Sequence, residues 1–545
     1  MRRPLILAAA VAIVAATAPL ARTQSNALSV VAVEVSSRAE AAYVAANFDE
    51  THRYLPGFVE IVVRPGDDER LKALGYDFDV VTADLVKSEN AKRAAAGPAR
   101  LIALPGPDRS DYRRLADFNA EMKDLAAKNP TIVKLITLPN KTLEGRTVFG
   151  LEIARNVKAV DGRPTLYIDG IHHAREWPAG EYPMIYAHHL VESLKARDPQ
   201  ITRLAGDLRF LIVPVVNADG FDYARSSLVD ARGAAGTPLA IAGAEAYWRK
   251  NRRSYTGVTT NVPGVIQRNL DAYGTDPNRN YGYKWGDNKS GSSSEQTNQT
   301  YRGTKPFSEP ETQNVRSLLL GRHATGVLSN HTYSRLVLRP WGDTDEPSPD
   351  EALLEKIGEG MAEAMGGYRN ILGIELYVTT GTLNDWAYGT SGSLAYVLEH
   401  GDEFHPVYGD GPGEEFPGVI GAFTQMAEAA ASPRNHSVIS GRVVGRDGRP
   451  ISAKLTAVKR FENPLWPGNP SGKKTFPHVI DTASQTAANG TFSWHVNPST
   501  RPAVQAAGGR EAYTVTISAP GAKAVTRQVV VRRGQRLDLG TIRLG

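Results

Sequence analysis

The sequence contains no cysteine at any of its 545 positions. The protein therefore folds without disulfide bonds, is not anchored to a membrane through a lipidated cysteine, and holds no metal ion through thiolates. Any metal site in it has to be built from histidine and carboxylate side chains.

The sequence also lacks a strong excess of either charge. Its 63 Lys and Arg residues stand against 58 Asp and Glu, which leaves a net charge of +5 without a basic run. This balance argues against a nucleic-acid partner. Hydrophobic residues make up 41% of the chain and charged residues 22%, as in ordinary soluble proteins. At this length we expect two or three domains.

Residues 1–21 have the pattern of a signal peptide. Arg2 and Arg3 precede an apolar stretch at 5–18, and small residues at 16–18 offer a cleavage site. The stretch is too short to span a membrane comfortably, which favours a signal over a membrane anchor. The arginine pair leaves twin-arginine export open. We expect a secreted protein, extracellular or periplasmic, with no membrane span after signal removal.

The next region, residues 25–88, predicts a small α/β domain. Apolar runs with strand character alternate with helical patterns, and Gly75 ends the second helix. The expected strands cover 28–35, 58–63 and 78–81, and the expected helices cover 39–47 and 67–74.

Three further regions follow. Residues 89–107 are rich in Ala, Lys, Arg, Gly and Pro, which is typical of a linker. Residues 108–432 alternate helical patterns with short apolar runs and predict an α/β layered domain. Residues 436–545 carry short β-rich runs between Gly and Pro turns, which favours a β-sandwich.

His173 and Glu176 follow an apolar run at 165–171 that predicts a buried strand. Near a helix start, side chains three positions apart fall on one side and can reach one ion. Imidazole and carboxylate together suit Zn²⁺. The pair alone is a weak signal, because most such pairs belong to a solvated helix face. His172 stands four positions before Glu176, and we expect it to be packed rather than to bind metal.

Four apolar runs of the middle region end in polar residues, which are His173, Asn217, His331 and Glu399. Ligands of open α/β sheets bind beyond the carboxyl ends of the strands, so we expect these side chains to converge. A zinc hydrolase needs three protein ligands, one open position and a base. His173, Glu176 and His331 could be the ligands, and Glu399 is the candidate base.

Six short motifs follow one another along the middle region. They are His-Ala-Arg-Glu-Trp at 173–177, Asn-Ala-Asp-Gly at 217–220, Tyr-Trp-Arg-Lys-Asn-Arg at 247–252, Asp-Pro-Asn-Arg-Asn-Tyr at 276–281, His-Thr-Tyr-Ser at 331–334, and Tyr377 with Gly381, Asp385-Trp386 and Glu399. In their order and residues they resemble the motifs of zinc metallocarboxypeptidases of the carboxypeptidase A type. The resemblance covers residues 108–432 and implies a mixed-sheet α/β/α catalytic domain. In addition, residues 25–88 resemble the pro-domain of the family, and residues 436–545 resemble the transthyretin-like sandwich of some members.

The resemblance implies a catalytic centre with one Zn²⁺. His173, Glu176 and His331 match its ligands, and His₂Glu is the known ligand set of carboxypeptidase A itself. Glu399 matches the general base that acts on the zinc-bound water, and Arg249 matches the arginine that steadies the scissile carbonyl. The supporting residue that matches the carboxylate behind His173 is Asp276.

The resemblance also implies a substrate site. Asn278, Arg279 and Tyr377 match the residues that grip the free carboxylate of a peptide. Arg175 either lines the substrate channel or forms an ordinary salt bridge. Asn384 occupies the base of the side-chain pocket, and its walls match Leu338, Leu372 and Val397.

The expected function is therefore a secreted zinc carboxypeptidase acting on peptides or proteins with a free C-terminus. Because Asn384 is neutral, we expect a preference for apolar or aromatic C-terminal residues. A peptidoglycan stem-peptide peptidase of the same fold and a non-catalytic peptide-binding module remain as alternatives. The N-terminal domain is either a pro-segment, released by cleavage near Lys92, Arg93 and Arg100, or a permanent domain that only docks. We expect the C-terminal sandwich to serve folding or attachment.

Overall fold

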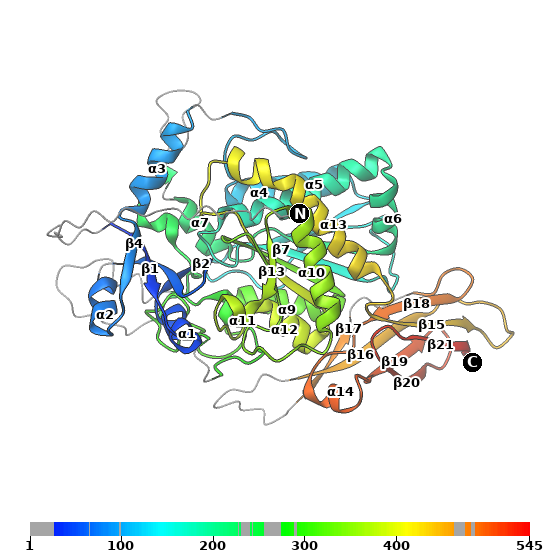
Figure 1. Ribbon diagram of the computed structural model, residues 1–545. Coiled ribbons are helices and arrows are strands. Elements are labelled where there is room, and N and C mark those ends of the chain that lie inside the picture. Colours follow the sequence, from blue (N-terminus) through cyan, green and yellow to red (C-terminus); the bar gives the residue numbers. More distant parts are fainter. Residues whose placement is uncertain are drawn as a thin grey trace, which may run out of the picture.

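The computed structural model describes residues 27–64, 66–97, 100–226, 228–229, 240–241, 243–255, 274–287, 291–462, 475–480 and 485–545. The expected signal peptide lies outside these residues. None of the helices in the described ranges has the length and hydropathy needed to cross a membrane. Figure 1 shows a central α/β domain with the N-terminal domain on one side and the C-terminal β-sheets on another.

The N-terminal domain is an antiparallel sheet of order β2-β3-β1-β4 with two helices. The Ser37 side chain accepts a hydrogen bond from the backbone N–H of Glu40 and so caps the first helix. Val33, Val44 and Ile61 are fully buried in its core. The elements are β1 (Ser29–Glu34), α1 (Arg38–Asn47), β2 (Asp49–Leu55), β3 (Phe58–Val63), α2 (Asp67–Ala73) and β4 (Phe78–Thr82). Sequence patterns indicated five of these six elements and missed β2.

Strand β2 contains a bulge. Glu50 pairs with Ile61 and Tyr54 pairs with Val59, so the register shifts between Glu50 and Tyr54. His52 lies inside the bulge with φ of 71°, in the left-handed region that few residues other than glycine adopt. A bulge bends its strand and redirects a side chain, and here the redirected side chain is the imidazole of His52.

Helix α3 (Leu85–Ala95) occupies the first part of the segment 89–107 that the composition indicated as a linker. The Asp84 side chain caps it by accepting from Lys87 N, and its Ala and Lys residues favour helix. Its buried residues are Leu85, Glu89 and Arg93, four positions apart along one face. Arg93 is buried at 5% exposure, so the basic pair expected at a cleavage site is partly enclosed in the folded chain.

The central domain is built on an eight-stranded sheet of order β13-β12-β14-β11-β7-β8-β6-β5. The strands β14, β11, β7 and β8 run parallel, whereas β12 and β6 are antiparallel to their inner neighbours. The strands are β5 (Val133–Thr137), β6 (Phe149–Ile153), β7 (Thr165–Gly170), β8 (Arg209–Val213), β11 (Gly326–Thr332), β12 (Leu336–Arg339), β13 (Arg369–Leu372) and β14 (Leu394–His400).

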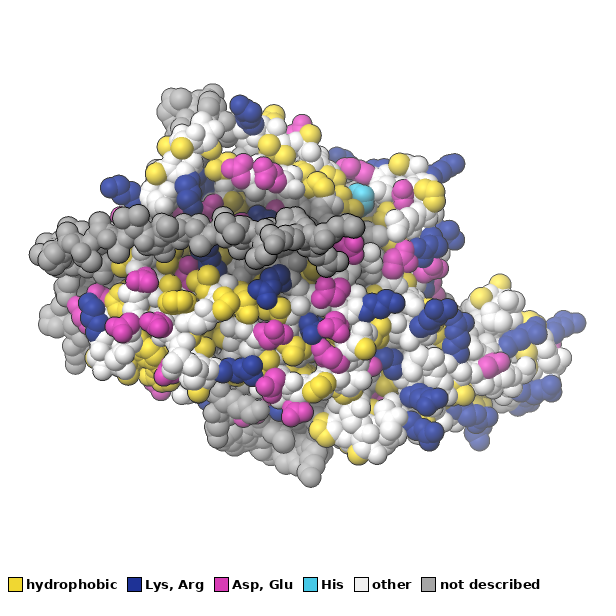
Figure 2. Space-filling model, in the orientation of Figure 1, with side chains coloured by type: hydrophobic (Ala, Val, Ile, Leu, Met, Phe, Trp, Pro, Cys, Tyr) yellow, Lys and Arg dark blue, Asp and Glu magenta, His cyan; other side chains and the backbone are white. Residues whose placement is uncertain are grey.

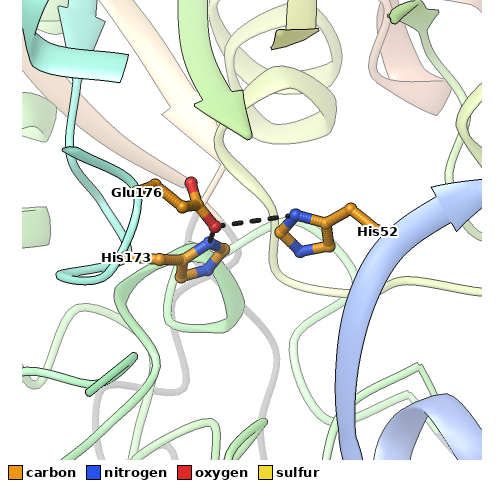
Figure 3. A group of neighbouring side chains, drawn as sticks. All are labelled: His52, His173 and Glu176. Carbon is orange, nitrogen blue, oxygen red and sulfur yellow. Dashed lines mark hydrogen bonds and ion pairs between the residues drawn. The ribbon is translucent and has the colours of Figure 1, made fainter. Parts of the chain in front are cut away.

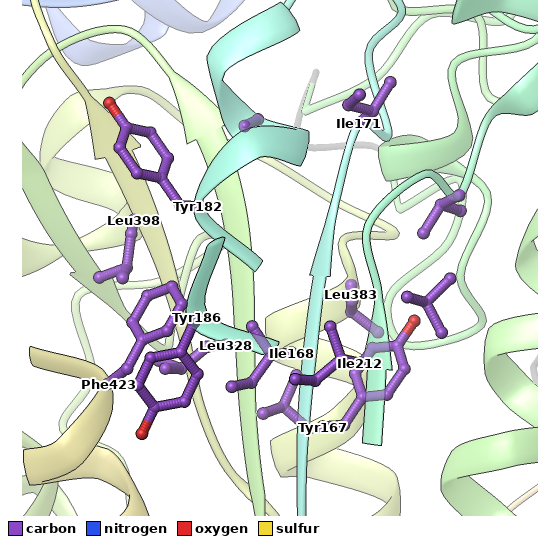
Figure 4. Packing of buried hydrophobic residues seen from close by; sticks show 14 of the residues in the cluster. Tyr167, Ile168, Ile171, Tyr182, Tyr186, Ile212, Leu328, Leu383, Leu398 and Phe423 are labelled. Carbon is purple, nitrogen blue, oxygen red and sulfur yellow. The ribbon is translucent and has the colours of Figure 1, made fainter. Parts of the chain in front are cut away.

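Helices cover this sheet. Tyr186 of α5 and Phe423 of α13 pack near Leu398 and Leu328, as Figure 4 shows. A Cβ atom added at Gly170 would lie 2.0 Å from the carbonyl oxygen of Ala179, so glycine is required where β7 meets α5. The helices are α4 (Leu115–Lys128), α5 (Trp177–Ala196), α6 (Pro199–Asp207), α7 (Ala218–Ser226), α9 (Pro310–Arg322), α10 (Glu351–Met365), α11 (Gly373–Leu376), α12 (Leu383–Trp386) and α13 (Glu414–Ala431). The expected mixed-sheet α/β architecture is confirmed.

The C-terminal region forms two sheets, of order β18-β15-β21 and β17-β16-β19-β20. They enclose a separate apolar core that includes Trp494 and Val515. This arrangement agrees with the expected sandwich. The strands are β15 (Ser437–Val444), β16 (Lys454–Glu462), β17 (Thr475–Ile480), β18 (Thr491–Val496), β19 (Glu511–Ser518), β20 (Val525–Val531) and β21 (Arg536–Arg543).

One buried lysine joins the sandwich to the central domain. Lys459 Nζ donates to the carbonyl oxygen of Ser391, 3.0 Å away in the central domain, and lies 2.9 Å from the Glu511 carboxylate. A buried charge needs such partners. The exposed face of the sandwich carries many Lys and Arg side chains (Figure 2).

Candidate active site

The central feature of the molecule is a buried cluster at the carboxyl ends of β7, β11 and β14. His173 lies in the turn after β7, and Glu176 directly precedes α5, with its N–H donating to His173 O. His331 lies on β11 opposite Glu399 of β14. The parallel strands thus place residues that are far apart in sequence at one edge of the sheet, as the sequence led us to expect.

Three side chains that could each give a ligand atom to a metal meet at one point, and we call His173, Glu176 and His331 the donor cluster. His173 Nδ1 lies 2.6 Å from Glu176 Oε1, and His331 Nδ1 lies 2.9 Å from Glu176 Oε2. The two Nδ1 atoms are 3.3 Å apart. All three side chains are fully buried.

These donors suit zinc. Ligands of a tetrahedral zinc ion, at about 2.0–2.1 Å from the metal, lie about 3.3–3.4 Å from one another. The separation of the two histidine nitrogens, 3.3 Å, agrees with that geometry. His173 Nε2 lies 3.1 Å from Asp276 Oδ1. Because a carboxylate at one ring nitrogen fixes the proton there, Nδ1 of His173 keeps its lone pair for a metal.

The electrostatics of the cluster favour a charged carboxylate between two imidazoles. Burial opposes ionisation of Glu176, but His173 and His331 hold its pKa well below its usual range. Burial lowers the pKa of His173, and the nearby Arg249 guanidinium lowers it further. Burial also opposes protonation of His331, but Glu176 raises its pKa, so a metal ion would compete with a proton at that ring.

Asp276 connects the cluster to Arg249. Arg249 Nη2 and Nε lie 2.9 and 3.1 Å from Asp276 Oδ2, while the other oxygen of Asp276 faces His173. Burial opposes the charge on Asp276, but Arg249 and His173 keep its pKa well below its usual range. The backbone N–H of Asn278 also donates to Asp276, at 2.8 Å.

Arg249 and Arg279 hold a carboxylate that belongs to the N-terminal domain. Glu50 Oε1 lies 2.8 Å from Arg249 Nη2 and 3.2 Å from Arg279 Nη2. Burial opposes the charge on Glu50, but Arg249, His52 and Arg279 lower its pKa. Arg279, which resembles part of a substrate carboxylate site, and Arg249, which resembles the arginine at the scissile carbonyl, thus both bind a side chain of β2.

His52 of β2 lies next to the donor cluster, as Figure 3 shows. Its Nδ1 is 3.6 Å from Glu176 Oε1 and 3.3 Å from Glu399 Oε2. Burial opposes protonation of His52, but Glu399 and Glu50 raise its pKa to about 10. The sequence does not indicate that His52 lies at the site, because His52 belongs to no motif and its neighbours in the chain are polar.

Glu399 lies at the end of β14 and is 3% exposed. Among the described residues, its Oε2 atom makes no hydrogen bond of standard geometry, and its close neighbour is His52 Nδ1 at 3.3 Å. Without His52 this buried carboxylate oxygen would have no partner, which is costly, so another group is expected to meet it when the N-terminal domain has left the site. This position, beside the donor cluster, suits an acceptor for a proton.

Two of the expected substrate residues contact the N-terminal domain. Arg175 donates to Asp49 Oδ1 and to the carbonyl oxygen of Glu50, both at 2.7 Å, so it forms the salt bridge that was one of its two expected roles. Tyr377 is buried in the apolar core of the N-terminal domain, and its ring centroid lies 6.4 Å from that of His52.

The residues expected to form the walls of the side-chain pocket lie in two neighbouring apolar clusters. Leu338 and Val397 lie in the same cluster, and Tyr54 of β2 packs against it. Leu372 packs against a neighbouring cluster that includes Ile374. Asn384 lies on α12 and is buried at 5% exposure.

His172, which precedes the motif at 173–177, is packed against other side chains. His172 Nε2 lies 2.8 Å from the Tyr281 hydroxyl, and its Nδ1 lies 3.5 Å from Ser329 Oγ. It points to these groups and not to the Glu176 carboxylate, in agreement with the expectation for it.

In a comparison with protein families, residues 118–409 match the family described as zinc carboxypeptidase. Zinc carboxypeptidase A 1 of Anopheles gambiae is 27% identical over 367 residues, which are 65% of this chain and 75% of the relative. Carboxypeptidase B of Astacus astacus is 29% identical over 302 residues, covering 54% of this chain and 87% of that relative. Relatives of both the A and the B type are thus similar to this chain.

Solved structures share the fold. The carboxypeptidase A from Helicoverpa armigera superposes with a TM-score of 0.58 at 22% identity and covers 74% of this chain and 98% of its own. The thrombin activatable fibrinolysis inhibitor superposes with a TM-score of 0.55 at 20% identity, with the same coverage of both chains. At this level of identity the likeness concerns the fold alone.

Proposed function

This chain belongs to the zinc carboxypeptidase family and is a metallocarboxypeptidase, and from this premise we propose that it is secreted and removes apolar or aromatic residues from the C-termini of peptides. The observation that supports this proposal best is the convergence of His173, Glu176 and His331 beside Glu399. Secretion is supported by the signal-peptide pattern at 1–21.

His173, Glu176 and His331 would hold the zinc ion. When bound, zinc acts as a Lewis acid and lowers the pKa of a water ligand toward about 7. Glu399 takes the proton of the attacking water and returns it to the leaving amine. Asp276 keeps His173 in the tautomer that presents Nδ1.

Arg249 and Arg279 orient the peptide. Both guanidinium groups already hold the Glu50 carboxylate, which supports their ability to hold the C-terminal carboxylate of a substrate. Arg249 also lies beside the donor cluster through Asp276, where it can stabilise negative charge on the scissile carbonyl oxygen. A donor of this kind is worth about 3 kcal/mol in comparable sites. Asn278 and Tyr377 complete the carboxylate site in this proposal.

The free carboxylate of the substrate gives one test of this arrangement. We expect Arg279→Ala to lower kcat/KM on free-acid peptides about 10- to 100-fold, because a charge-assisted hydrogen bond is lost. Hydrolysis of matched peptides with free and amidated C-termini measures the effect. The wild type should prefer the free acid strongly, and the variant should lose much of that preference.

Arg335→Ala is the matched control, since this exposed arginine pairs with Asp402 outside the cluster. It should behave as the wild type. Equal cleavage of amidated and free-acid peptides by the wild type would overturn the exopeptidase proposal.

The neutral Asn384 gives a second test, on specificity. We expect kcat/KM for a peptide ending in Phe to exceed that for one ending in Arg by at least about tenfold, because the neutral pocket offers no partner for a buried cation. Asn384→Asp should raise cleavage after Arg and lower cleavage after Phe. Side-by-side hydrolysis of blocked dipeptides measures both, and better cleavage after Arg by the wild type would contradict the assignment.

The flanking domains receive roles as part of the same proposal. Residues 25–88 act as a pro-like domain that fills the site, as the contacts of Glu50 with Arg249 and Arg279 suggest. Residues 108–432 form the catalytic domain. The sandwich at 436–545 supports its folding, which agrees with the buried contact between Lys459 and Ser391.

A further inference from the structure

His52 is the one site histidine that the N-terminal domain contributes. Its ring centroid lies 5.3 Å from that of His173 and 6.1 Å from that of His331. The ligand atoms of His52, His173 and Glu176 all lie within 4.8 Å of one another, and all three residues are buried. These atoms therefore have the spacing of ligands that share one metal ion.

We propose that in the intact chain His52 is the fourth ligand of the zinc ion, through Nδ1. The inference rests on the proposed function, because it requires zinc at His173, Glu176 and His331. His52 Nδ1 lies 3.6 Å from Glu176 Oε1, close to the roughly 3.3–3.4 Å between ligands of a tetrahedral zinc. A catalytic zinc keeps its fourth position for water or substrate, so His52 would close that position.

The backbone of β2 aims His52 at this point. The bulge and the left-handed φ of 71° turn its side chain out of the regular strand alternation. Residues on both sides are fastened to the catalytic domain. Asp49 lies 2.7 Å from Arg175, and the N–H of Tyr54 donates to Ser334 Oγ at 2.9 Å. A non-glycine residue held in this conformation at a site is a reason to expect a function.

The far side of the His52 ring faces one carboxylate and one guanidinium. His52 Nε2 lies 3.1 Å from Glu50 Oε2, and Glu50 is held in turn by Arg249 and Arg279. The same nitrogen lies 3.1 Å from Arg249 Nη1, which can only donate. Glu50 favours the tautomer with its proton on Nε2 and its lone pair on Nδ1, whereas Arg249 favours the other tautomer. Glu50 lies at Nε2 of His52 as Asp276 lies at Nε2 of His173.

A competing arrangement uses the same atoms. His52 Nδ1 also lies 3.3 Å from Glu399 Oε2 and 3.2 Å from the carbonyl oxygen of Thr332. A protonated His52 would pair with Glu399 and leave the fourth zinc position to water. The two arrangements differ in the number of imidazoles bound to zinc, which is measurable.

Zinc ligation by His52 would make β2 an internal substitute for substrate. His52 would take the metal position that substrate needs, and Glu50 takes the arginines proposed to hold the C-terminal carboxylate. A peptide could then bind productively only after β2 has left the site. This contact would thus keep the intact chain latent by direct ligation and not by steric cover alone.

X-ray absorption at the zinc edge of the full-length, zinc-loaded chain tests this. We expect three imidazoles in the wild type and two in His52→Gln, with zinc released to a chelator at least about tenfold faster in the variant. Arg53→Ala is the matched control, because Arg53 is the neighbouring residue, is half exposed and pairs with Glu60. It should retain three imidazoles and the wild-type release rate.

His52→Cys provides an independent measurement in a chain that has no other cysteine. A zinc–sulfur distance of about 2.3 Å in this variant would support the proposal, and a zinc shell without sulfur would contradict it. Two imidazoles in the wild type, or three in His52→Gln, would overturn it. If that wild type still binds one zinc and hydrolyses peptides after release of its N-terminal domain, the proposed function stands. A wild type that binds no zinc would instead overturn the proposed function.

Discussion

Replacing Glu399 with glutamine is expected to lower kcat about 10²- to 10⁴-fold while the zinc content stays at the wild-type value. The amide has nearly the same shape as the carboxylate but does not accept a proton from water. The three proposed zinc ligands are other residues, so metal binding should persist. Both quantities are to be measured after limited proteolysis has released the N-terminal domain, because that domain fills the site.

Glu403→Gln is a suitable control for this substitution. Glu403 follows β14 by a few residues and pairs with Lys92 on the surface, away from the donor cluster. It should keep full activity. If Glu399→Gln also turned over peptides at the wild-type rate, Glu399 would not be the base.

The core of the candidate site could be predicted because two simple rules apply to it. The strands β7, β11 and β14 are apolar runs, and each ends near a polar residue that suits a metal or a proton transfer. Parallel strands bring their carboxyl ends to one edge of a sheet. The convergence of His331 and Glu399 follows from these rules without knowledge of the loops, whereas their pairing in register is seen only in the structure.

Strand β2 could not be predicted from the same rules. Its sequence, Asp-Glu-Thr-His-Arg-Tyr-Leu, has no alternation of apolar and polar residues, although its first four residues are buried. They are buried because Asp49 and Glu50 meet arginines of the catalytic domain and not because they are hydrophobic. Such pairs join residues more than 100 positions apart, and a single sequence does not reveal them. In the sequence, the only sign of β2 is a run of polar residues between the helix expected at 39–47 and the strand expected at 58–63.

Helix α3, in the segment before the catalytic domain, could not be predicted for a similar reason. Its Ala and Lys residues are compatible with either a linker or a helix. The structure has a helix, α3, because one face finds partners: Glu89 lies 2.9 Å from His405 Nδ1, and Arg93 donates to the His405 carbonyl oxygen. The composition is compatible with the helix, but its contact with the catalytic domain depends on His405, about 300 positions away.

Loss of a proposed zinc ligand is expected to have the largest effect of all. His331→Ala should remove zinc from the purified protein and abolish peptide hydrolysis, since only His173 and Glu176 would remain on the catalytic domain. Asp276→Asn should weaken zinc binding by about 10- to 100-fold, the usual effect of losing a partner behind a ligand. The graded loss separates a ligand from a residue that orients a ligand.

Metal analysis and chelator competition measure this order after limited proteolysis has released the N-terminal domain, and activity restored to the stripped wild type by added zinc completes it. His172→Gln is the matched control, because the ring of His172 faces Tyr281 and Ser329. It should retain one zinc ion. Full zinc content in His331→Ala would contradict the ligand assignment. In the full-length chain His52 lies 3.6 Å from Glu176, so there the double variant His331→Ala with His52→Gln shows whether the N-terminal histidine replaces the missing ligand.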